Sequence, residues 1–172
     1  YKETLNSKGF PKKKMYQAKA SEKFALPVTQ NLFLKSDFEK EMYQQIKESV
    51  LLDSGESKYS DLPYYILKKY FERSSGMDYD QLVEEKVFRP LGLERITYRP
   101  LERFSKDEIV PSEIDSYFRH TELHGTVHDM GAAMQSGVGG HAGLFGDAYA
   151  VATIMQLYLQ GGKYNGIQLL QK

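Results

Sequence analysis

The 172-residue sequence contains no cysteine and no tryptophan, and it carries no net charge, since 23 Lys and Arg residues balance 23 Asp and Glu residues. The absence of cysteine excludes disulfides, thiolate metal sites and cysteine nucleophiles. The charge balance gives no electrostatic reason to expect nucleic acid or an anionic membrane surface as a partner. No apolar run in the sequence approaches the roughly 20 residues that a membrane-spanning helix needs.

Apolar residues that recur every three or four positions predict four helices. The first begins at Ser36, in a Ser-Asp-Phe-Glu sequence that matches a capping box. The second runs from about Ser60 to Ser74 and ends at Gly76. The third opens near Asp78, and the fourth spans roughly 147–159. The residues expected to face inward are Phe38, Met42, Ile46 and Val50 in the first helix, Leu62, Tyr65, Ile66 and Tyr70 in the second, Leu82, Val83 and Val87 in the third, and Val151, Ile154, Met155 and Tyr158 in the fourth.

These patterns predict one partial domain of the α+β class, dominated by helices and with few strands. A short extended segment is expected at 31–34 and another at 96–98, and an Asn-Gly pair at 165–166 predicts a hairpin turn. We expect residues 1–35 to be irregular, 36–93 to be helical, 94–146 to form a long functional loop region, and 147–172 to hold a helix and the start of a hairpin.

The segment Tyr59-Ser60-Asp61, at the start of the second predicted helix, is the most informative for chemistry. It places a phenol and a carboxylate two residues apart at a helix N-terminus, where backbone N–H groups favour negative charge. A phenol titrates near 10 in water and becomes a useful base at neutral pH only if positive neighbours lower its pKa. The structural alternative is that Ser60 or Asp61 caps the helix.

Three motifs in order resemble the serine β-lactamase-related superfamily, which includes class C β-lactamases, D-amino-acid peptidases and related esterases. They are Tyr59-Ser60-Asp61, then Leu91-Gly92-Leu93 after Phe88-Arg89-Pro90, then Gly139-Gly140-His141-Ala142-Gly143-Leu144-Phe145 before a helix that ends at Gly161-Gly162. The resemblance covers about residues 55–172. The segment 127–145 is similar to a bacterial subgroup that is often associated with cell-wall breakdown.

The resemblance implies the β-lactamase/transpeptidase-like fold and acyl transfer on a cell-wall peptide, β-lactam or small ester, without a metal or organic cofactor. It places the protein in the bacterial cell envelope or periplasm, with a small-molecule or peptidoglycan-derived substrate as partner. Tyr59 takes the position of the family's base or proton relay, and Ser60 and Asp61 hold the relay network. Most members have Asn where Asp61 stands. Because an ionised Asp only accepts hydrogen bonds, recognition of a β-lactam side-chain amide is put in doubt.

The family also needs Ser-X-X-Lys, in which the lysine activates the serine that is acylated. No serine of this sequence is followed by lysine three positions later. We expect that motif before residue 1 and the family's Lys- or His-Thr-Gly motif beyond residue 172, so that the chain alone is inactive. His141 is expected either to contact substrate in the cleft or to be a hydrogen-bonded structural histidine.

Two other functions remain open from the sequence. His120, His124 and His128 would align three imidazoles if they lay on one helix, with Asp129 nearby, which would suit a zinc-dependent hydrolase. Gly125, between the second and third histidine, argues against a helix there. The other possibility is a non-catalytic binding module that keeps the family's framework.

Overall fold

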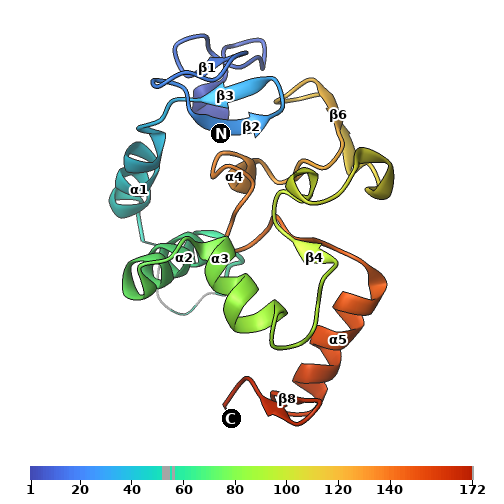
Figure 1. The fold of residues 1–172 in the computed structure, drawn as a ribbon. Helices are drawn as coiled ribbons and strands as arrows, with labels where there is room; N and C mark the ends of the chain where they lie inside the picture. The colour runs from blue at the N-terminus through green and yellow to red at the C-terminus, as the bar shows by residue number, and fades with distance from the viewer. Residues whose placement is uncertain (52–54, 56, 172) are drawn as a thin grey trace.

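The computed structural model describes residues 1–51, 55 and 57–171. It is a mixture of helices and short antiparallel strands, which agrees with the predicted α+β class (Figure 1). Its buried apolar side chains form two clusters. One cluster joins the N-terminal sheet to α1 (Phe38–Glu48) and α4 (Met130–Ala133). The other joins α5 (Ala148–Leu159) to the segment that follows α3 (Tyr79–Val83).

Residues 1–35 are more ordered than the sequence predicts. They contain β1 (Tyr16–Gln17), β2 (Leu26–Thr29) and β3 (Leu32–Leu34), which form an antiparallel sheet in the order β1-β3-β2. These strands are two to four residues long, so they are too short to show an alternating pattern, and β2 includes a proline. The segment expected to be irregular therefore contains a small sheet, and the extended piece predicted at 31–34 corresponds to β3.

Helix α1 (Phe38–Glu48) begins where it was predicted but is not held by a capping box. The Ser36 hydroxyl instead donates to the Glu22 carbonyl at 2.7 Å and accepts from the Ala25 N–H at 3.1 Å. Glu39, the other half of the predicted box, forms an ion pair at 2.6 Å with Lys69 of α2 (Leu62–Ser75). Val50 lies beyond the helix and is 92% exposed. Most of the helix end predicted at 53–57 lies outside the described residues.

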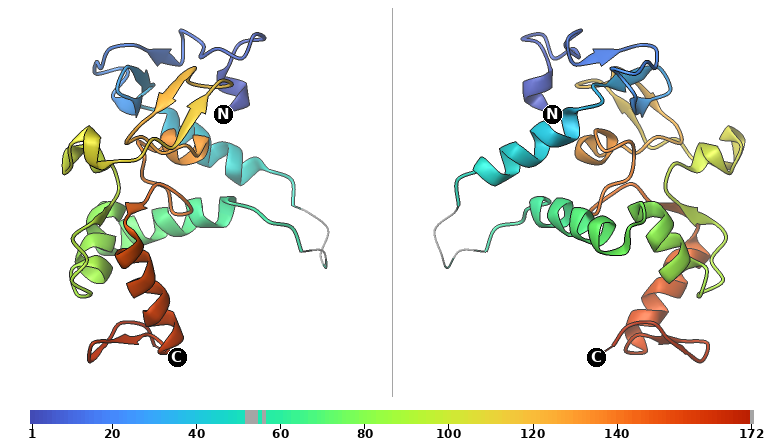
Figure 2. Two further views of the ribbon diagram at one scale, coloured as in Figure 1. Left: turned by 90° about the vertical axis from the view of Figure 1, so that its right-hand side faces the viewer. Right: turned by 60° about the vertical axis from the view of Figure 1, so that its left-hand side comes forward.

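The next helices match the predicted positions. Helix α2 (Leu62–Ser75) ends at Gly76, whose φ of 70° lies in the left-handed region that favours glycine. Helix α3 (Tyr79–Val83) continues into a π-helical turn over Glu84–Phe88. Figure 2 shows α2 running beneath α1, with α4 between α2 and the N-terminal sheet.

Helix α5 (Ala148–Leu159) is capped by the Asp147 carboxylate, which accepts from the Ala150 N–H at 2.8 Å. It buries Ala150, Thr153 and Leu157, whereas the predicted inward residues Val151, Met155 and Tyr158 are at least half exposed. The helix is apolar on most sides, so periodicity alone did not identify the buried face. The predicted hairpin follows as β8 (Lys163–Tyr164) and β9 (Ile167–Gln168), joined by Asn165 and Gly166, both at positive φ.

The predicted loop region contains short elements that fix its path. β4 (Ile96–Thr97) pairs with β7 (Phe145–Gly146), and β5 (Glu113–Asp115) pairs with β6 (Thr121–Leu123). Helix α4 (Met130–Ala133) follows, and short 3-10 helices lie at Lys2–Thr4, Pro100–Glu102 and Lys106–Glu108. Within the described ranges, no helix combines the length and the apolar character needed to cross a bilayer.

Candidate active site

The predicted motif lies at the mouth of α2, where Tyr59 is 85% exposed. The Tyr59 hydroxyl donates a hydrogen bond to the Asp61 carboxylate at 2.7 Å. The Ser60 hydroxyl accepts from the Leu62 N–H at 3.2 Å and so organises the first turn. Asp61 stands at the N-cap position, but its side chain makes no capping hydrogen bond. Of the two residues proposed as structural caps, Ser60 therefore acts locally on the backbone, and the Asp61 carboxylate remains directed to the phenol.

His141 reaches the same region from the glycine-rich loop. Its side chain is 5% exposed, and its Nε2 lies 2.9 Å from the Asp129 carboxylate. Asp129 is fixed in turn, because the same carboxylate oxygen accepts from the Ala132 N–H at 2.7 Å and caps α4. The His141 ring stacks on Tyr65, with centroids 4.8 Å apart. His141 Nδ1 is buried and has no hydrogen-bond partner among the described residues.

Two glycines allow this loop and α4 to approach α2. A Cβ at Gly140 would overlap the backbone carbonyl oxygen of Tyr64, and a Cβ at Gly131 would overlap the hydroxyl of Tyr65. The Tyr98 hydroxyl also donates to the Gly139 carbonyl at 3.2 Å, which holds the loop from its other side. Glycine is therefore required at these positions for close backbone approach rather than for a turn alone.

A buried ion pair positions the segment before Asp129. The side chains of Asp115 and Arg119 are fully buried and lie 2.6 Å apart. The Arg119 guanidinium also donates to the carbonyls of Val127 at 2.7 Å and His128 at 2.5 Å. Because these carbonyls immediately precede Asp129, the ion pair fixes the backbone from which the Asp129 side chain projects.

Asp61, Asp129 and His141 converge from three separate segments, and each offers an oxygen or nitrogen within 4.8 Å of the other two.

The negative charges of Asp61 and Asp129 affect the pKa values of the nearby tyrosines. A hydrogen bond to Asp61, together with the negative charge of Asp61, raises the pKa of Tyr59. Burial, followed by the charges of Asp129 and Asp61, raises the pKa of Tyr65 to about 12. In the described part of the chain, therefore, no neighbour lowers the pKa of Tyr59. The positive side chains that would lower it are expected from the rest of the protein.

The alternative of three aligned histidines required a helix, whereas Thr121–Leu123 form strand β6, so the imidazoles of His120, His124 and His128 are not aligned on one helix. His120 stacks on Phe10 with centroids 4.2 Å apart, and His124 Nε2 lies 2.9 Å from the Lys106 carbonyl oxygen. Within the described ranges, the sole group of three potential metal-binding side chains is Asp61, Asp129 and His141. His141 Nε2 is already engaged by Asp129, and Nδ1 lacks the second hydrogen-bond partner that a metal-bound histidine normally has. We therefore interpret this group as a hydrogen-bonded cluster.

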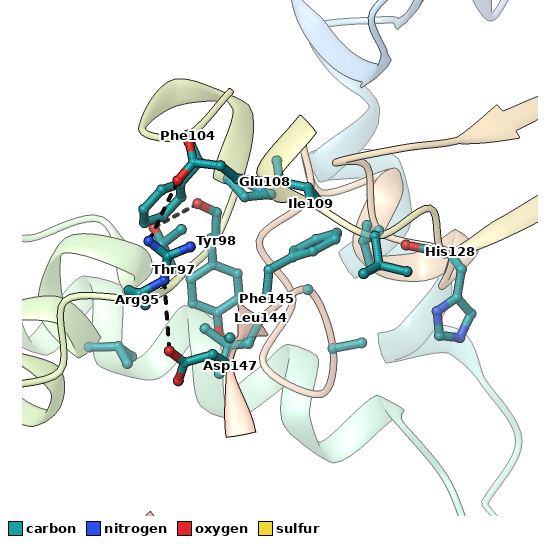
Figure 3. Close-up of a pocket in the computed structure, with 18 of the residues that line it drawn as sticks. Arg95, Thr97, Tyr98, Phe104, Glu108, Ile109, His128, Leu144, Phe145 and Asp147 are labelled. Atoms are coloured by element: carbon teal, nitrogen blue, oxygen red, sulfur yellow. Dashed lines mark hydrogen bonds and ion pairs between the residues drawn. The ribbon is translucent and has the colours of Figure 1, made fainter. Parts of the chain in front are cut away.

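A cavity of about 830 Å³ has His141, a member of the cluster, in its wall. Thr97, Tyr98, Phe104 and Phe145 contribute to its lining (Figure 3). Arg95, also in the wall, lies 3.5 Å from Glu108 and 3.7 Å from Asp147, and these ion pairs link the segment before β4 to both sides of the cavity. Tyr59 and Asp61 do not line this cavity. His141 is therefore the residue through which the cluster contacts the cavity.

Comparison with known proteins identifies the family. The family described as beta-lactamase matches residues 9–172. The chain belongs to the β-lactamase family. A putative D-alanyl-D-alanine carboxypeptidase of Salmonella agona (strain SL483) is 35% identical over 140 residues, which are 73% of this chain and 32% of that protein. A protein of the same description from Salmonella gallinarum (strain 287/91 / NCTC 13346) matches equally. The chain thus spans about a third of the length of these relatives.

Solved structures of this β-lactamase-family fold are similar at much lower identity. An octameric penicillin-binding protein homologue from Pyrococcus abyssi superposes with a TM-score of 0.53 at 16% identity, over 77% of this chain and 28% of that one. A D-amino acid amidase from Ochrobactrum anthropi SV3, complexed with D-phenylalanine, gives a TM-score of 0.54 at 11% identity. The superposition covers 91% of this chain and 43% of that one. The predicted β-lactamase/transpeptidase-like fold is thereby confirmed.

Sequence reasoning did not identify the partners of His141. Asp129 was considered only as a possible metal ligand, and Tyr65 only as an inward-facing residue of a helix. The Val-His-Asp sequence at 127–129 was part of the resemblance, but nothing in the sequence indicates that its aspartate meets a histidine twelve residues later. That contact depends on how α4 folds the chain back.

Proposed function

We propose that the protein to which this chain belongs is a serine hydrolase that transfers the acyl group of a cell-wall peptide, β-lactam or ester in the bacterial cell envelope. The observation that carries the proposal is the Tyr59 hydroxyl, exposed at the start of α2 and paired with Asp61 at 2.7 Å. The description of the Salmonella relatives as putative D-alanyl-D-alanine carboxypeptidases supports a peptide substrate.

The proposed reaction uses a serine and a lysine from the rest of the protein. As the serine oxygen bonds to the carbonyl carbon, its proton passes to the lysine. As the bond from that carbon to the leaving nitrogen or oxygen breaks, Tyr59 donates its hydroxyl proton to the leaving atom and regains a proton from the lysine. The lysine also provides the positive charge that lowers the pKa of Tyr59 from its raised value, because its ammonium group pairs with Asp61.

The decisive experiment compares Tyr59→Phe with the unaltered full-length protein, using ester turnover and acylation by a fluorescent penicillin. Loss of the relay should lower kcat by about 100- to 10,000-fold. Tyr70→Phe is the matched control, because Tyr70 lies on α2, is 62% exposed and is remote from the cluster. Full turnover in Tyr59→Phe would contradict the proposal. A protein that neither labels nor turns over an ester before mutation would instead be a non-catalytic member of the family.

A further inference from the structure

Three charged side chains, Arg95, Glu108 and Asp147, lie together in the wall of the cavity of about 830 Å³ (Figure 3). Their side chains are 54%, 44% and 41% exposed, so a ligand can reach all three. The Arg95 guanidinium is 3.5 Å from Glu108 and 3.7 Å from Asp147, beyond the roughly 3.2 Å of an ordinary N–H···O hydrogen bond. Its N–H groups therefore remain available to a ligand.

The two carboxylates are each oriented by one oxygen. One oxygen of Glu108 accepts from the N–H and the hydroxyl of Ser105, both at 3.1 Å. One oxygen of Asp147 accepts from the Ala150 N–H at 2.8 Å. In both residues the second oxygen is the one nearest the guanidinium. The carboxylates are thus fixed by hydrogen bonds outside the ion pairs, and each offers its second oxygen to a ligand.

The charges of this group favour a neutral ligand that both donates and accepts hydrogen bonds. An anion that approached Arg95 would also approach two carboxylates, and a cation that contacted both carboxylates would also approach the guanidinium. A hydroxyl group avoids both repulsions, because it donates to a carboxylate oxygen and accepts from an N–H group. Adjacent hydroxyls of a saccharide repeat this pair, and hydrogen bonds to charged groups are the stronger kind.

Apolar side chains line another part of the same cavity. Leu144 is 45% exposed, and Phe145 lies next to it in the wall (Figure 3). Apolar walls with a few fixed polar groups are typical of small-molecule sites, whose volumes are roughly 300–1,000 Å³. The C–H face of a sugar ring suits the apolar wall, and its hydroxyl groups suit the charged one.

A peptide in the cavity would also present donors and acceptors, but it fits this wall less well. Extended peptides are usually bound by main-chain hydrogen bonds along the edge of a sheet. The strands beside the cavity, β4 and β7, have two residues each and are paired with one another. The polar groups described above are side chains, which favours recognition of hydroxyl groups.

The cavity and the candidate active site share His141. This residue lines the cavity, and it offers a ring nitrogen within 4.8 Å of an oxygen of Asp61. Asp61 in turn holds the Tyr59 hydroxyl at 2.7 Å. A group bound in the cavity can therefore be part of a larger substrate whose reacting bond lies at Tyr59.

We propose, on the basis of the function proposed above, that this cavity is a saccharide subsite, in which Arg95, Glu108 and Asp147 hydrogen-bond the hydroxyls of a sugar attached to the cell-wall peptide. Leu144 and Phe145 contact the C–H face of the same sugar. The substrate class is then a glycopeptide, and the sugar contributes to substrate binding and not to the proton relay.

The test is calorimetric titration of the full-length protein with a tetrasaccharide of N-acetylglucosamine. The unaltered protein should bind it, and Arg95→Met, which removes the guanidinium but keeps an unbranched side chain, should bind it about tenfold or more weakly, as expected for the loss of one or more charge-assisted hydrogen bonds. Arg103→Met is the matched control, because Arg103 also lies over the Phe104 ring but does not line the cavity. It should bind like the unaltered protein.

A second variant keeps the test decisive if Arg95→Met does not show native circular dichroism. Leu144→Ala changes the apolar wall without touching an ion pair and should weaken binding by about threefold or more. Absence of binding to the unaltered protein overturns the inference, as does equal binding by folded Arg95→Met. Equal weakening in Arg103→Met would also overturn it, because the effect would then not come from the cavity.

Turnover separates a sugar from a peptide in the cavity. For a D-alanyl-D-alanine peptide with and without an N-acetylmuramyl group, the sugar should lower KM in the unaltered protein and lose this effect in Arg95→Met. An Arg95→Met effect that is the same on both peptides would assign the cavity to the peptide and overturn the inference. Saccharide binding with a fully active Tyr59→Phe would remove only the proposed function, whereas no binding with an inactive Tyr59→Phe would remove only the subsite.

Discussion

The Tyr65 ring lies nearly parallel to the His141 imidazole, with an angle of 15° between their planes. Gly131 leaves the space for the Tyr65 hydroxyl, because a Cβ on Gly131 would overlap it. We expect Gly131→Ala to push Tyr65 off His141 and to lower the free energy of unfolding by about 1–3 kcal/mol, the usual range for overpacking. Urea unfolding measures this loss.

A second substitution separates that contact from a general cost of replacing glycine. Tyr65→Phe removes the overlapping oxygen, so the double variant should recover most of the stability lost in Gly131→Ala. Gly76→Ala is the control, since no atom lies within 4 Å of its Cβ position and its φ of +70° alone opposes alanine. If Tyr65→Phe rescued both alanine variants equally, the proposed overlap would not be the cause.

The buried pair of Asp115 and Arg119 predicts a pH-dependent stability. Burial acts to raise the pKa of Asp115, but hydrogen bonds from Arg119 and from the N–H groups of residues 117–119 lower it overall from 3.8. A lowered folded-state pKa contributes stability that is present above the unfolded value and lost as pH falls through the folded one. Acid should therefore destabilise the unaltered protein more than Asp115→Asn.

Unfolding measured from pH 7 down to pH 2 tests this relationship. At neutral pH, Asp115→Asn leaves the Arg119 charge buried without its partner and should cost about 3–5 kcal/mol. The difference in the free energy of unfolding between the unaltered protein and Asp115→Asn should be constant well above pH 3.8 and shrink below it. Asp37→Asn serves as the surface control, because Asp37 pairs with Lys35 at 3.0 Å in an exposed position. A gap that persists unchanged at low pH would refute the assignment.

Asp61 predicts an altered preference among substrates in the full-length protein. Asp61→Asn converts an acceptor-only group into one that also donates, as in most members of the superfamily. We expect acylation by penicillins with an amide side chain to increase by about tenfold relative to turnover of an ester that lacks the amide. The ratio of the two kcat/KM values is the measurement. A decrease in that ratio would show that Asp61 does not face the amide.

The exposed apolar sides of α2 and α5 predict that a polar substitution there will affect the stability of this chain and of the longer protein differently. Ile66 and Val151 are 53% and 51% exposed here. If the remainder of the protein covers these faces, Ile66→Lys should change the stability of the isolated chain by less than about 0.5 kcal/mol and destabilise the full-length protein by more than about 2 kcal/mol. Equal effects in both proteins would mean that this face stays in solvent.

Chelation distinguishes the serine mechanism from a metal-dependent one. Because His120 and His124 contact carbonyl oxygens, we expect the zinc content of the full-length protein to be the same in His124→Ala as in the unaltered protein. Treatment with EDTA should leave ester turnover unchanged. Activity that is lost with EDTA and restored by zinc would favour the metal-dependent alternative.

The sequence was sufficient to locate α2 and α5, because capping residues, periodicity and a terminal glycine agree there. It was insufficient to say which face of α5 is buried, since Val151 and Leu157 are equally apolar and the neighbours that choose between them are distant in the chain. The N-terminal strands were missed for a related reason. A strand of two residues, such as Tyr16–Gln17, gains its stability from Leu34 across the sheet and not from its own pattern.

In the candidate site, too, the sequence predicts the local interactions but not the contacts between residues distant in the chain. Tyr59 and Asp61 are neighbours in the sequence, and their interaction follows from local geometry, so a motif can predict it. The interaction of Asp129 with His141 depends on α4, on the backbone held by Arg119 and on the packing of a loop against α2. Each of these is a tertiary contact that leaves no periodic signal in the sequence.

The contact of Gly140 with the backbone of Tyr64 limits how this region can be engineered. A loop transplanted from a relative would reproduce the site only if its own glycine met the first turn of α2 at the same distance. A Cβ at position 140 would overlap the carbonyl oxygen of Tyr64, so any side chain there would have to push the loop and the first turn of α2 apart. Libraries that diversify the loop should therefore hold this position constant, or vary it together with the turn that it touches.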